Sequence, residues 1–163
     1  MLIGVFSDVH DHLANLAKAL DAFSKRAIDT AIFCGDFCSP IVARAIARFE
    51  GTVHCVFGNG DGDRFAMLNF ARGAGTNLVL HGEHAELELG GVKIAVTHYP
   101  FYARALARTG DYRAVFSGHT HAQTEERFGE CLWVNPGDVM GWQNPPTVAV
   151  YDTGTNSVEI IAL

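Results

Sequence analysis

Three short apolar runs alternate with helix-like segments in the first half of the chain. The runs are residues 2–6, 31–34 and 52–57, each of a length typical of one buried strand. Apolar residues recur at helical spacing over residues 13–23, and Ser39-Pro40 is typical of the start of a second helix, expected to run through Ile46 to Phe49. A third helix is expected over residues 65–71. This alternation predicts a parallel sheet covered by helices.

The second half of the chain predicts antiparallel strands. Residues 85–89 alternate apolar and charged side chains, Gly90-Gly91 is expected to turn the chain, and residues 92–97 return as a more buried strand. We expect a helix over residues 101–108, a strand over 114–117, a hairpin turning at 128–131, and last strands over 147–151 and 158–163. No repeat or linker divides the chain, so residues 1–163 are expected to form a single α/β domain with mixed sheets.

Composition and charge exclude several classes of protein. The chain has 163 residues, 48% of them hydrophobic, which is enough for one well-packed core. No apolar stretch approaches the roughly 20 residues that cross a bilayer, and the start lacks a leader pattern, so we expect a cytoplasmic protein without membrane contact. The net charge is −6 without a basic cluster, which argues against long nucleic acid as a partner. The four cysteines form no Cys-x-x-Cys pair and are expected to be reduced thiols.

Polar side chains collect where the predicted strands end. The carboxyl ends of parallel strands meet at one edge of a sheet, where such folds bind ligands. We therefore expect these groups to point into a common crevice. They are Asp8 and His10 after the first strand, Asp36 after the second, Asn59 and Asp61 after the third, His98 after residues 92–97, and His119 and His121 after residues 114–117.

The expected set contains only nitrogen and oxygen donors. Carboxylates and imidazoles suit Mn²⁺, Fe²⁺, Co²⁺, Ni²⁺ and Zn²⁺, and need no thiolate. Seven ligand groups exceed what one tetrahedral ion takes, whereas a bridging carboxylate would let them hold two. Sites with two ions about 3.5–4 Å apart recur in phosphoryl transfer. Turn formation is the alternative for each motif alone, because Asn, Asp and Gly favour turns.

The motifs together resemble the calcineurin-like metallophosphoesterase superfamily. They are Asp8-x-His10, Gly35-Asp36, Gly58-Asn59-x-Asp61, Thr97-His98 and Gly118-His119-x-His121, and Asn135-Pro136-Gly137-Asp138 resembles a further motif. The short length and the opening SDVHDHLANL are most similar to its small stand-alone prokaryotic phosphodiesterase branch. The resemblance implies a four-layer α-β-β-α sandwich of the metallo-dependent phosphatase type, and a homo-oligomer is compatible with it.

The resemblance also implies a role for each residue. Asp8, His10 and His121 would hold one ion, and Asn59, His98 and His119 the other. Asp36 would bridge the two ions, and Asp61 would orient the site from behind. Mn²⁺ is the first choice of metal, with Ni²⁺, Fe²⁺, Co²⁺ or Zn²⁺ as alternatives. The implied reaction is hydrolysis of a small phosphodiester by in-line attack of a metal-bridging hydroxide. The residues implied in catalysis are Asp36, Asn59, Asp61 and His98.

Gly60 departs from the pattern of the resembled family. Many relatives have a His at this position, which stabilises the phosphate charge and protonates the leaving oxygen. Loss of such a general acid costs about 10²–10⁴-fold in rate, most of all for poor leaving groups. We therefore expect a preference for diesters or activated esters, with phosphomonoesterase activity as an alternative.

Two further functions remain as alternatives. A scaffold that has lost catalysis would explain Gly60, although it would not need seven ligand groups. A nucleotide-binding domain built on residues 58–62 is the other, but the spacing fails Gly-x-Gly-x-x-Gly and follows the third strand rather than the first.

Residues beside the motifs have structural interpretations. Tyr99-Pro100-Phe101-Tyr102 is either an aromatic wall of the substrate pocket or helix-start packing, and the sequence favours the second. Asp11 is expected to cap the first helix, with His12 at the rim. Asp63-Arg64 is interpreted as a pair of helix-start charges, with phosphate binding by Arg64 as the alternative.

Overall fold

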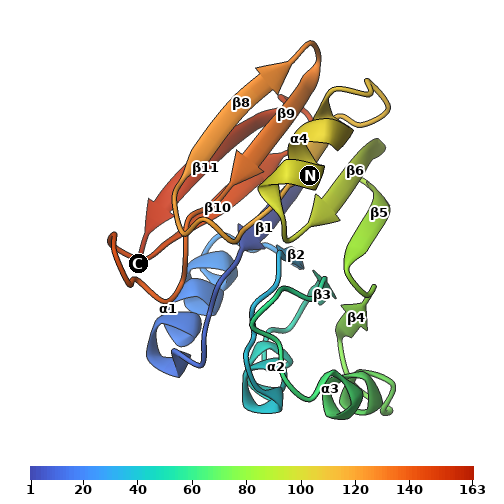
Figure 1. Cartoon of the computed structure of the whole chain (residues 1–163). Coiled ribbons are helices and arrows are strands. Elements are labelled where there is room, and N and C mark those ends of the chain that lie inside the picture. Colours follow the sequence, from blue (N-terminus) through green and yellow to red (C-terminus); the bar gives the residue numbers. More distant parts are fainter.

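The computed structural model describes residues 1–163 and folds them into two mixed sheets flanked by helices (Figure 1). The first sheet has the order β11-β10-β1-β2-β3-β4 and the second the order β5-β6-β7-β9-β8. The strands of the first sheet are β1 (Leu2–Phe6), β2 (Thr30–Phe33), β3 (Thr52–Cys55), β4 (Leu78–Leu80), β10 (Thr147–Asp152) and β11 (Ser157–Ala162). Those of the second are β5 (His84–Leu89), β6 (Val92–Thr97), β7 (Ala114–Phe116), β8 (Thr124–Phe128) and β9 (Cys131–Asn135).

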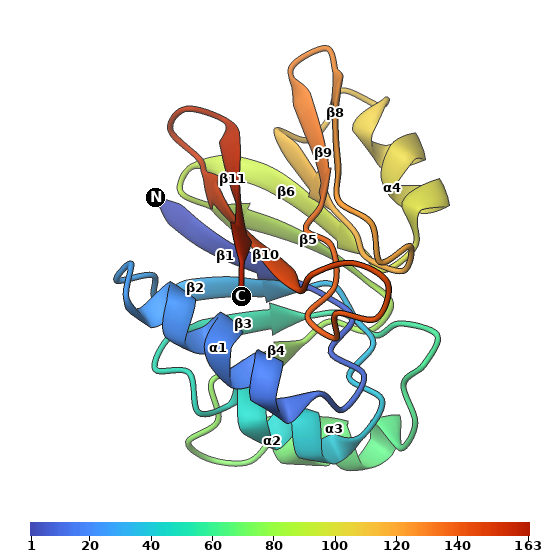
Figure 2. The ribbon, with the colours of Figure 1, turned by 90° about the vertical axis from the view of Figure 1, so that its left-hand side faces the viewer.

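Four helices form the two outer layers. They are α1 (Leu13–Ser24), α2 (Pro40–Ile46), α3 (Arg64–Ala71) and α4 (Pro100–Ala107). Figure 2 shows α1, α2 and α3 together on one face of the first sheet, and α4 on the outer face of the second sheet. The layers therefore follow the order helix, sheet, sheet, helix, which confirms the predicted four-layer α/β sandwich.

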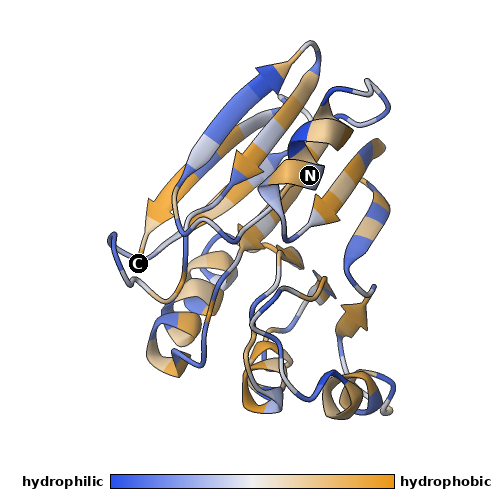
Figure 3. Ribbon diagram, in the orientation of Figure 1, coloured by the Kyte–Doolittle hydropathy of each residue, from blue (hydrophilic) through white to orange (hydrophobic).

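Three apolar clusters fill the three spaces between the layers. Successive side chains of a strand point to opposite faces, so Phe6 of β1 packs toward the helices while Val5 packs between the sheets. A smaller cluster joins the second sheet to α4 through Ala103 and Ala107. The edge strand β8 is largely hydrophilic, as Figure 3 shows, and its residues are exposed or half-buried. None of the helices is of the length and apolarity that a membrane crossing requires.

Several predicted boundaries are wrong. β4 was not predicted, because its three residues are too few to show a pattern, and they are placed by parallel pairing with β3. The third strand ends at Cys55 rather than residue 57, and α2 ends at Ile46, short of Phe49. Asp11 does not cap α1: the cap is His12, whose Nδ1 accepts a hydrogen bond from the backbone N of Asn15. Asp11 instead accepts a hydrogen bond from the hydroxyl of Ser39.

Parallel pairing aligns the carboxyl ends of strands in both sheets. β1, β2 and β3 pair in parallel in the first sheet, and β6, β7 and β9 do so in the second. Backbone hydrogen bonds continue past the strand ends, from Asp8 N to Gly35 O and from Gly118 N to His98 O, both at 3.0 Å. The loops after β1 and β2, and those after β6 and β7, are therefore fixed against one another.

Candidate metal centre

The loops after five strands bring the predicted ligand groups into one cluster. Two sets of ligand atoms each lie within 4.8 Å of one another. The sets are Asp8, His10 and His121, and Asp8, Asp36 and His98. Both aspartates and His98 are buried, whereas His10 and His121 are partly accessible. The cluster therefore has a buried acidic centre and an open side.

Asn59 and His119 complete the cluster on the side of His98. The carboxamide oxygen of Asn59 lies 3.1 Å from His98 Nε2 and 2.7 Å from His119 Nδ1. The His98 and His119 rings meet edge to face, with centroids 5.1 Å apart. The structure thus brings together all seven residues that the sequence predicts as metal ligands, and their binding of metal stays a prediction.

The backbone at this cluster adopts an uncommon conformation. Five of the seven predicted ligands have a positive φ, the left-handed region that non-glycine residues seldom occupy. They are Asp8 (55°), His10 (43°), Asp36 (64°), His119 (73°) and His121 (57°). Such strain costs about 1–3 kcal/mol per residue and gathers at functional sites. The concentration of strain at one edge of the sheets is independent support for a functional site there.

Two glycines permit the close approach of these loops. A Cβ on Gly118 would overlap Ser7 Oγ and lie 2.5 Å from Asp8 Oδ2. A Cβ on Gly58 would overlap Asp36 Oδ1. The loop after β7 therefore packs directly on the carboxylate that follows β1, and the loop after β3 packs on the one that follows β2.

Three imidazoles are held through their outward-facing Nδ1 atoms. His98 Nδ1 lies 2.8 Å from the carbonyl oxygen of Cys34, His121 Nδ1 lies 2.8 Å from Asp138 Oδ2, and His10 Nδ1 lies 3.2 Å from Cys38 Sγ. Each contact leaves Nε2 directed at the cluster. Histidines that bind metal are oriented in this way, by a partner on the other ring nitrogen.

The inward-facing atoms are acceptors that oppose one another. Because His98 Nδ1 donates its proton to a carbonyl, Nε2 of the neutral ring is an acceptor. It faces the Asn59 oxygen at 3.1 Å and Asp36 Oδ2 at 3.4 Å. His10 Nε2 is buried without a hydrogen-bond partner, 3.4 Å from Asp36 Oδ2. A shared cation would satisfy acceptors arranged in this way, so the residues present fit divalent metal ions.

The charges of the cluster favour cations as well. The Asp8 carboxylate is the main cause that raises the pKa of His10 above its ordinary value. Burial lowers the pKa of His98, but Asp36 and Asp8 outweigh burial, so this pKa is also raised. Burial would raise the pKa of Asp36, yet His98 and the Gly60 N–H outweigh it and lower this pKa. The carboxylates therefore create a strongly negative centre.

Asp61 supports the loops from behind the cluster. Its two carboxylate oxygens accept hydrogen bonds from the backbone N atoms of Cys38, at 3.0 Å, and Gly58, at 2.7 Å. Burial raises the pKa of Asp61, although these two N–H groups act against the rise. The contacts join the loop after β3 to the loop after β2, in agreement with an orienting role.

Asp63 and Arg64 belong to the start of α3. Asp63 caps the helix by accepting a hydrogen bond from the Ala66 backbone N, at 3.0 Å. The Arg64 guanidinium donates to the Gly58 carbonyl at 2.6 Å and to Glu83 at 3.1 Å, and lies over the Phe57 ring. The cap by Asp63 and the contacts of Arg64 agree with the helix-start interpretation, and phosphate binding by Arg64 stays an alternative.

Sequence reasoning gave no role to the residues that orient the imidazoles. Asp138 was identified only as part of the Asn135-Pro136-Gly137-Asp138 motif, and it accepts a hydrogen bond from the Trp142 backbone N as well as facing His121. The Cys34 carbonyl and the Cys38 thiol carry no signal in the sequence, because their contacts depend on the loop conformations. Burial raises the pKa of the Cys38 thiol to about 11, so it remains protonated at neutral pH.

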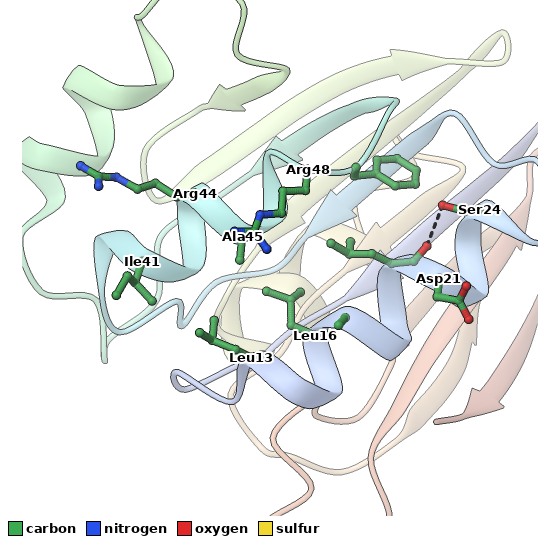
Figure 4. A pocket seen from close by; sticks show the side chains of 11 residues that line it. Leu13, Leu16, Asp21, Ser24, Ile41, Arg44, Ala45 and Arg48 are labelled. Atoms are coloured by element: carbon green, nitrogen blue, oxygen red, sulfur yellow. Dashed lines mark hydrogen bonds between the residues drawn. The ribbon is translucent and has the colours of Figure 1, made fainter.

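A cavity of about 520 Å³ lies elsewhere, between α1 and α2. Figure 4 shows Leu13 and Leu16 of α1 facing Ile41 and Ala45 of α2 across it. None of the seven predicted ligands lines this cavity. It is a groove between packed helices, separate from the metal cluster.

The fold and the cluster together define a metallophosphoesterase. Residues 1–156 match the family model described as the calcineurin-like phosphoesterase superfamily domain, and the chain belongs to this superfamily. The family consists of metal-dependent phosphoesterases, so the predicted family and class of enzyme are confirmed.

Individual relatives cover the chain from end to end. A phosphodiesterase of Methanocaldococcus jannaschii is 30% identical over an alignment of 166 positions, which covers 100% of this chain and 99% of the relative. A solved archaeal phosphodiesterase superimposes with a TM-score of 0.89 at 30% identity, and the match covers 100% of both chains. Vps29 from Entamoeba histolytica, solved with Zn²⁺, has a TM-score of 0.69 at 19% identity over 100% of this chain and 98% of that one, which shows the fold alone.

Proposed function

We propose that this protein is a dinuclear metal-dependent phosphodiesterase that hydrolyses a small phosphodiester. The observation that carries the proposal is the set of opposed acceptors at the open end of the two sheets, where His10 Nε2, His98 Nε2, Asp36 and Asn59 face one another. Sequence similarity to archaeal phosphodiesterases over the whole chain supports the choice of a diester.

The proposal divides the ligands into two sets. Asp8, His10 and His121 hold one ion, and Asn59, His98 and His119 hold the other. A bridging role for Asp36 is supported by its Oδ2, which lies 3.4 Å from His10 Nε2 and 3.4 Å from His98 Nε2, one nitrogen from each set. Mn²⁺ is the proposed metal, because carboxylate, carboxamide and imidazole donors suit it, with Ni²⁺, Fe²⁺, Co²⁺ or Zn²⁺ as alternatives.

The chain's own residues position the reaction rather than perform it. Two divalent ions held by these residues would supply an activated water for in-line attack and positive charge against the phosphate oxygens. Asp138, the Cys34 carbonyl and Cys38 hold the imidazoles in the required orientation. Asn59, on the exposed loop, contributes its oxygen next to the open side of the cluster. No side chain at Gly60 protonates the leaving oxygen, so diesters and activated esters are the preferred substrates.

The alternatives belong to the same fold. A phosphomonoesterase would need a proton donor that the loop after β3 does not supply. A scaffold without catalysis would need neither five strained ligand residues nor oriented imidazoles, although it would explain Gly60. A cytoplasmic location, a homo-oligomer and the absence of nucleic-acid or membrane partners stay predictions.

Turnover of a matched pair of substrates tests the proposal. Metal-stripped protein is supplied with Mn²⁺, Ni²⁺, Zn²⁺ or Mg²⁺ and assayed with bis(p-nitrophenyl) phosphate and with p-nitrophenyl phosphate. We expect metal-dependent hydrolysis of the diester, faster than that of the monoester, and none in the Asp36→Asn variant. Absence of turnover with every metal, in protein that has bound its ions, would favour the scaffold.

A further inference from the structure

An aromatic path leads from the metal cluster to a neighbouring cavity. Tyr99 follows His98 directly and precedes α4. Its ring meets the His119 ring edge to face, with centroids 5.4 Å apart, and meets the Tyr102 ring with centroids 6.0 Å apart. Tyr99 therefore touches a predicted metal ligand on one side and the first turn of α4 on the other.

The cavity beyond Tyr99 has a volume of about 400 Å³. Its apolar lining includes Tyr99, Tyr102 and Leu106, and its polar lining includes Glu83 and Thr97. This volume lies within the range of about 300–1,000 Å³ typical of small-molecule pockets. The cavity thus offers aromatic rings and a carboxylate next to the metal cluster.

Core packing does not account for the two tyrosines. The apolar cluster that joins α4 to the second sheet is built from Ala103 and Ala107 of this helix and includes neither Tyr99 nor Tyr102. Tyr102 is 56% exposed, so its ring contributes little to the packing of α4. The helix-start interpretation favoured by the sequence is therefore insufficient, and the aromatic wall is the better explanation.

We propose that this cavity binds the aromatic base of a nucleotide-like substrate whose phosphate lies at the metal cluster. Any nucleobase can stack on an aromatic side chain, because every base has a π-face, and Tyr102 offers such a ring. The Glu83 carboxylate, held at the rim by Arg64, is an acceptor for the exocyclic amino group of a base. The inference rests on the proposed phosphodiesterase function and specifies its substrate class as nucleoside phosphodiesters.

Binding of two phosphates that differ only in the base tests the inference without requiring turnover. Adenosine 5′-monophosphate and ribose 5-phosphate are titrated into Mn²⁺-loaded protein by calorimetry. We expect the nucleotide to bind about 10-fold more tightly, as one base–aromatic stack provides. The Tyr102→Ala variant should lose this advantage, and Tyr102→Phe should keep it, because the ring and not the hydroxyl makes the stack.

Phe65→Ala is the matched control, because Phe65 is a ring of similar exposure, 76%, that does not line the cavity, whereas the Phe101 ring packs edge to face on Tyr102. It should leave the nucleotide advantage unchanged. Equal affinities for the two phosphates in the unaltered protein, or an advantage that survives Tyr102→Ala, would overturn the inference. A nucleotide advantage in a protein that hydrolyses no diester would support the base site and refute the proposed hydrolysis, so the two failures are distinguishable.

Discussion

At the scale of single residues, Gly60 determines which esters the site is expected to cleave. Its backbone N donates a hydrogen bond to Asp36 Oδ1 at 2.7 Å, so the main chain at this position supports the carboxylate that is proposed to bridge the two ions. No side chain extends from it toward a substrate. In the proposed reaction, position 60 therefore offers no group to protonate the leaving oxygen.

Gly60→His should raise the turnover of esters with poor leaving groups relative to p-nitrophenyl esters by about 10²-fold, since an imidazole would act as a general acid. The three heavy atoms nearest to a Cβ at this position would be those of the Asp36 carboxyl group, at 3.3 Å, so the loop accommodates a side chain with small shifts. The ratio of kcat values for a dialkyl phosphodiester and bis(p-nitrophenyl) phosphate measures the effect. Gly60→Ala is the control, and an equal ratio in the two variants would show that the imidazole transfers no proton.

The predicted ligand residues could be identified from the sequence because each has a side chain able to bind metal and lies just after a predicted strand. Asp8, Asp36 and His98 are polar groups placed just after apolar runs, Asp8 and Asp36 at the ends of neighbouring parallel strands of the first sheet and His98 at the end of β6 in the second. The groups that orient them were not predictable. Cys38 reaches His10 only because the loop after β2 adopts a left-handed conformation, with φ of 72° at Cys38.

At the scale of secondary-structure elements, the cluster depends on how closely the loops approach. The loop after β7 packs against the end of β1 at Gly118, and the backbone N of His119 donates a hydrogen bond to the Asp8 side chain at Oδ2, at 3.0 Å, which fixes the contact. The Asp8 carboxylate follows a strand of the first sheet and is therefore held in place by a loop of the second.

Gly118→Ala should lower the free energy of unfolding by about 1–3 kcal/mol, because overpacking forces the two loops apart. Urea denaturation in EDTA measures this loss without a contribution from bound metal. Gly62→Ala is the matched control, since its Cβ would meet only the Cys38 carbonyl at 3.4 Å. Equal stability of the two variants would contradict the packing assigned to Gly118.

Elements with a clear pattern were predicted better than those set by tertiary contacts. The alternation of Ala85, Leu87 and Leu89 predicted β5 correctly, because one face of this strand packs against the other sheet. β4 has only three residues and is defined by pairing with β3, which no local pattern reveals. The predicted end of α2 was wrong because Phe49 packs in the core after the helix has ended at Ile46. Its position in the sequence fits a helical spacing, although the residue is not helical.

At the scale of the whole molecule, the four layers place one site at the common end of two sheets. Each sheet contributes loops to this site. The three apolar clusters hold the layers together, so that the loops of the two sheets stay next to each other. The order of strands and helices alone predicted an α/β domain with mixed sheets, and the family resemblance implied the four-layer arrangement. The packing of the second sheet on the first did not, because it depends on side chains from distant parts of the chain.

Bound Mn²⁺ and diester turnover, measured on the same samples during titration of metal-stripped protein, test the central claim most directly. We expect two ions per chain, with turnover that rises as the second ion binds. The Asp36→Asn variant should lose the second ion and the turnover together, because the bridging carboxylate is shared. A single ion per chain in the unaltered protein, or full turnover by Asp36→Asn, would contradict the two-metal centre.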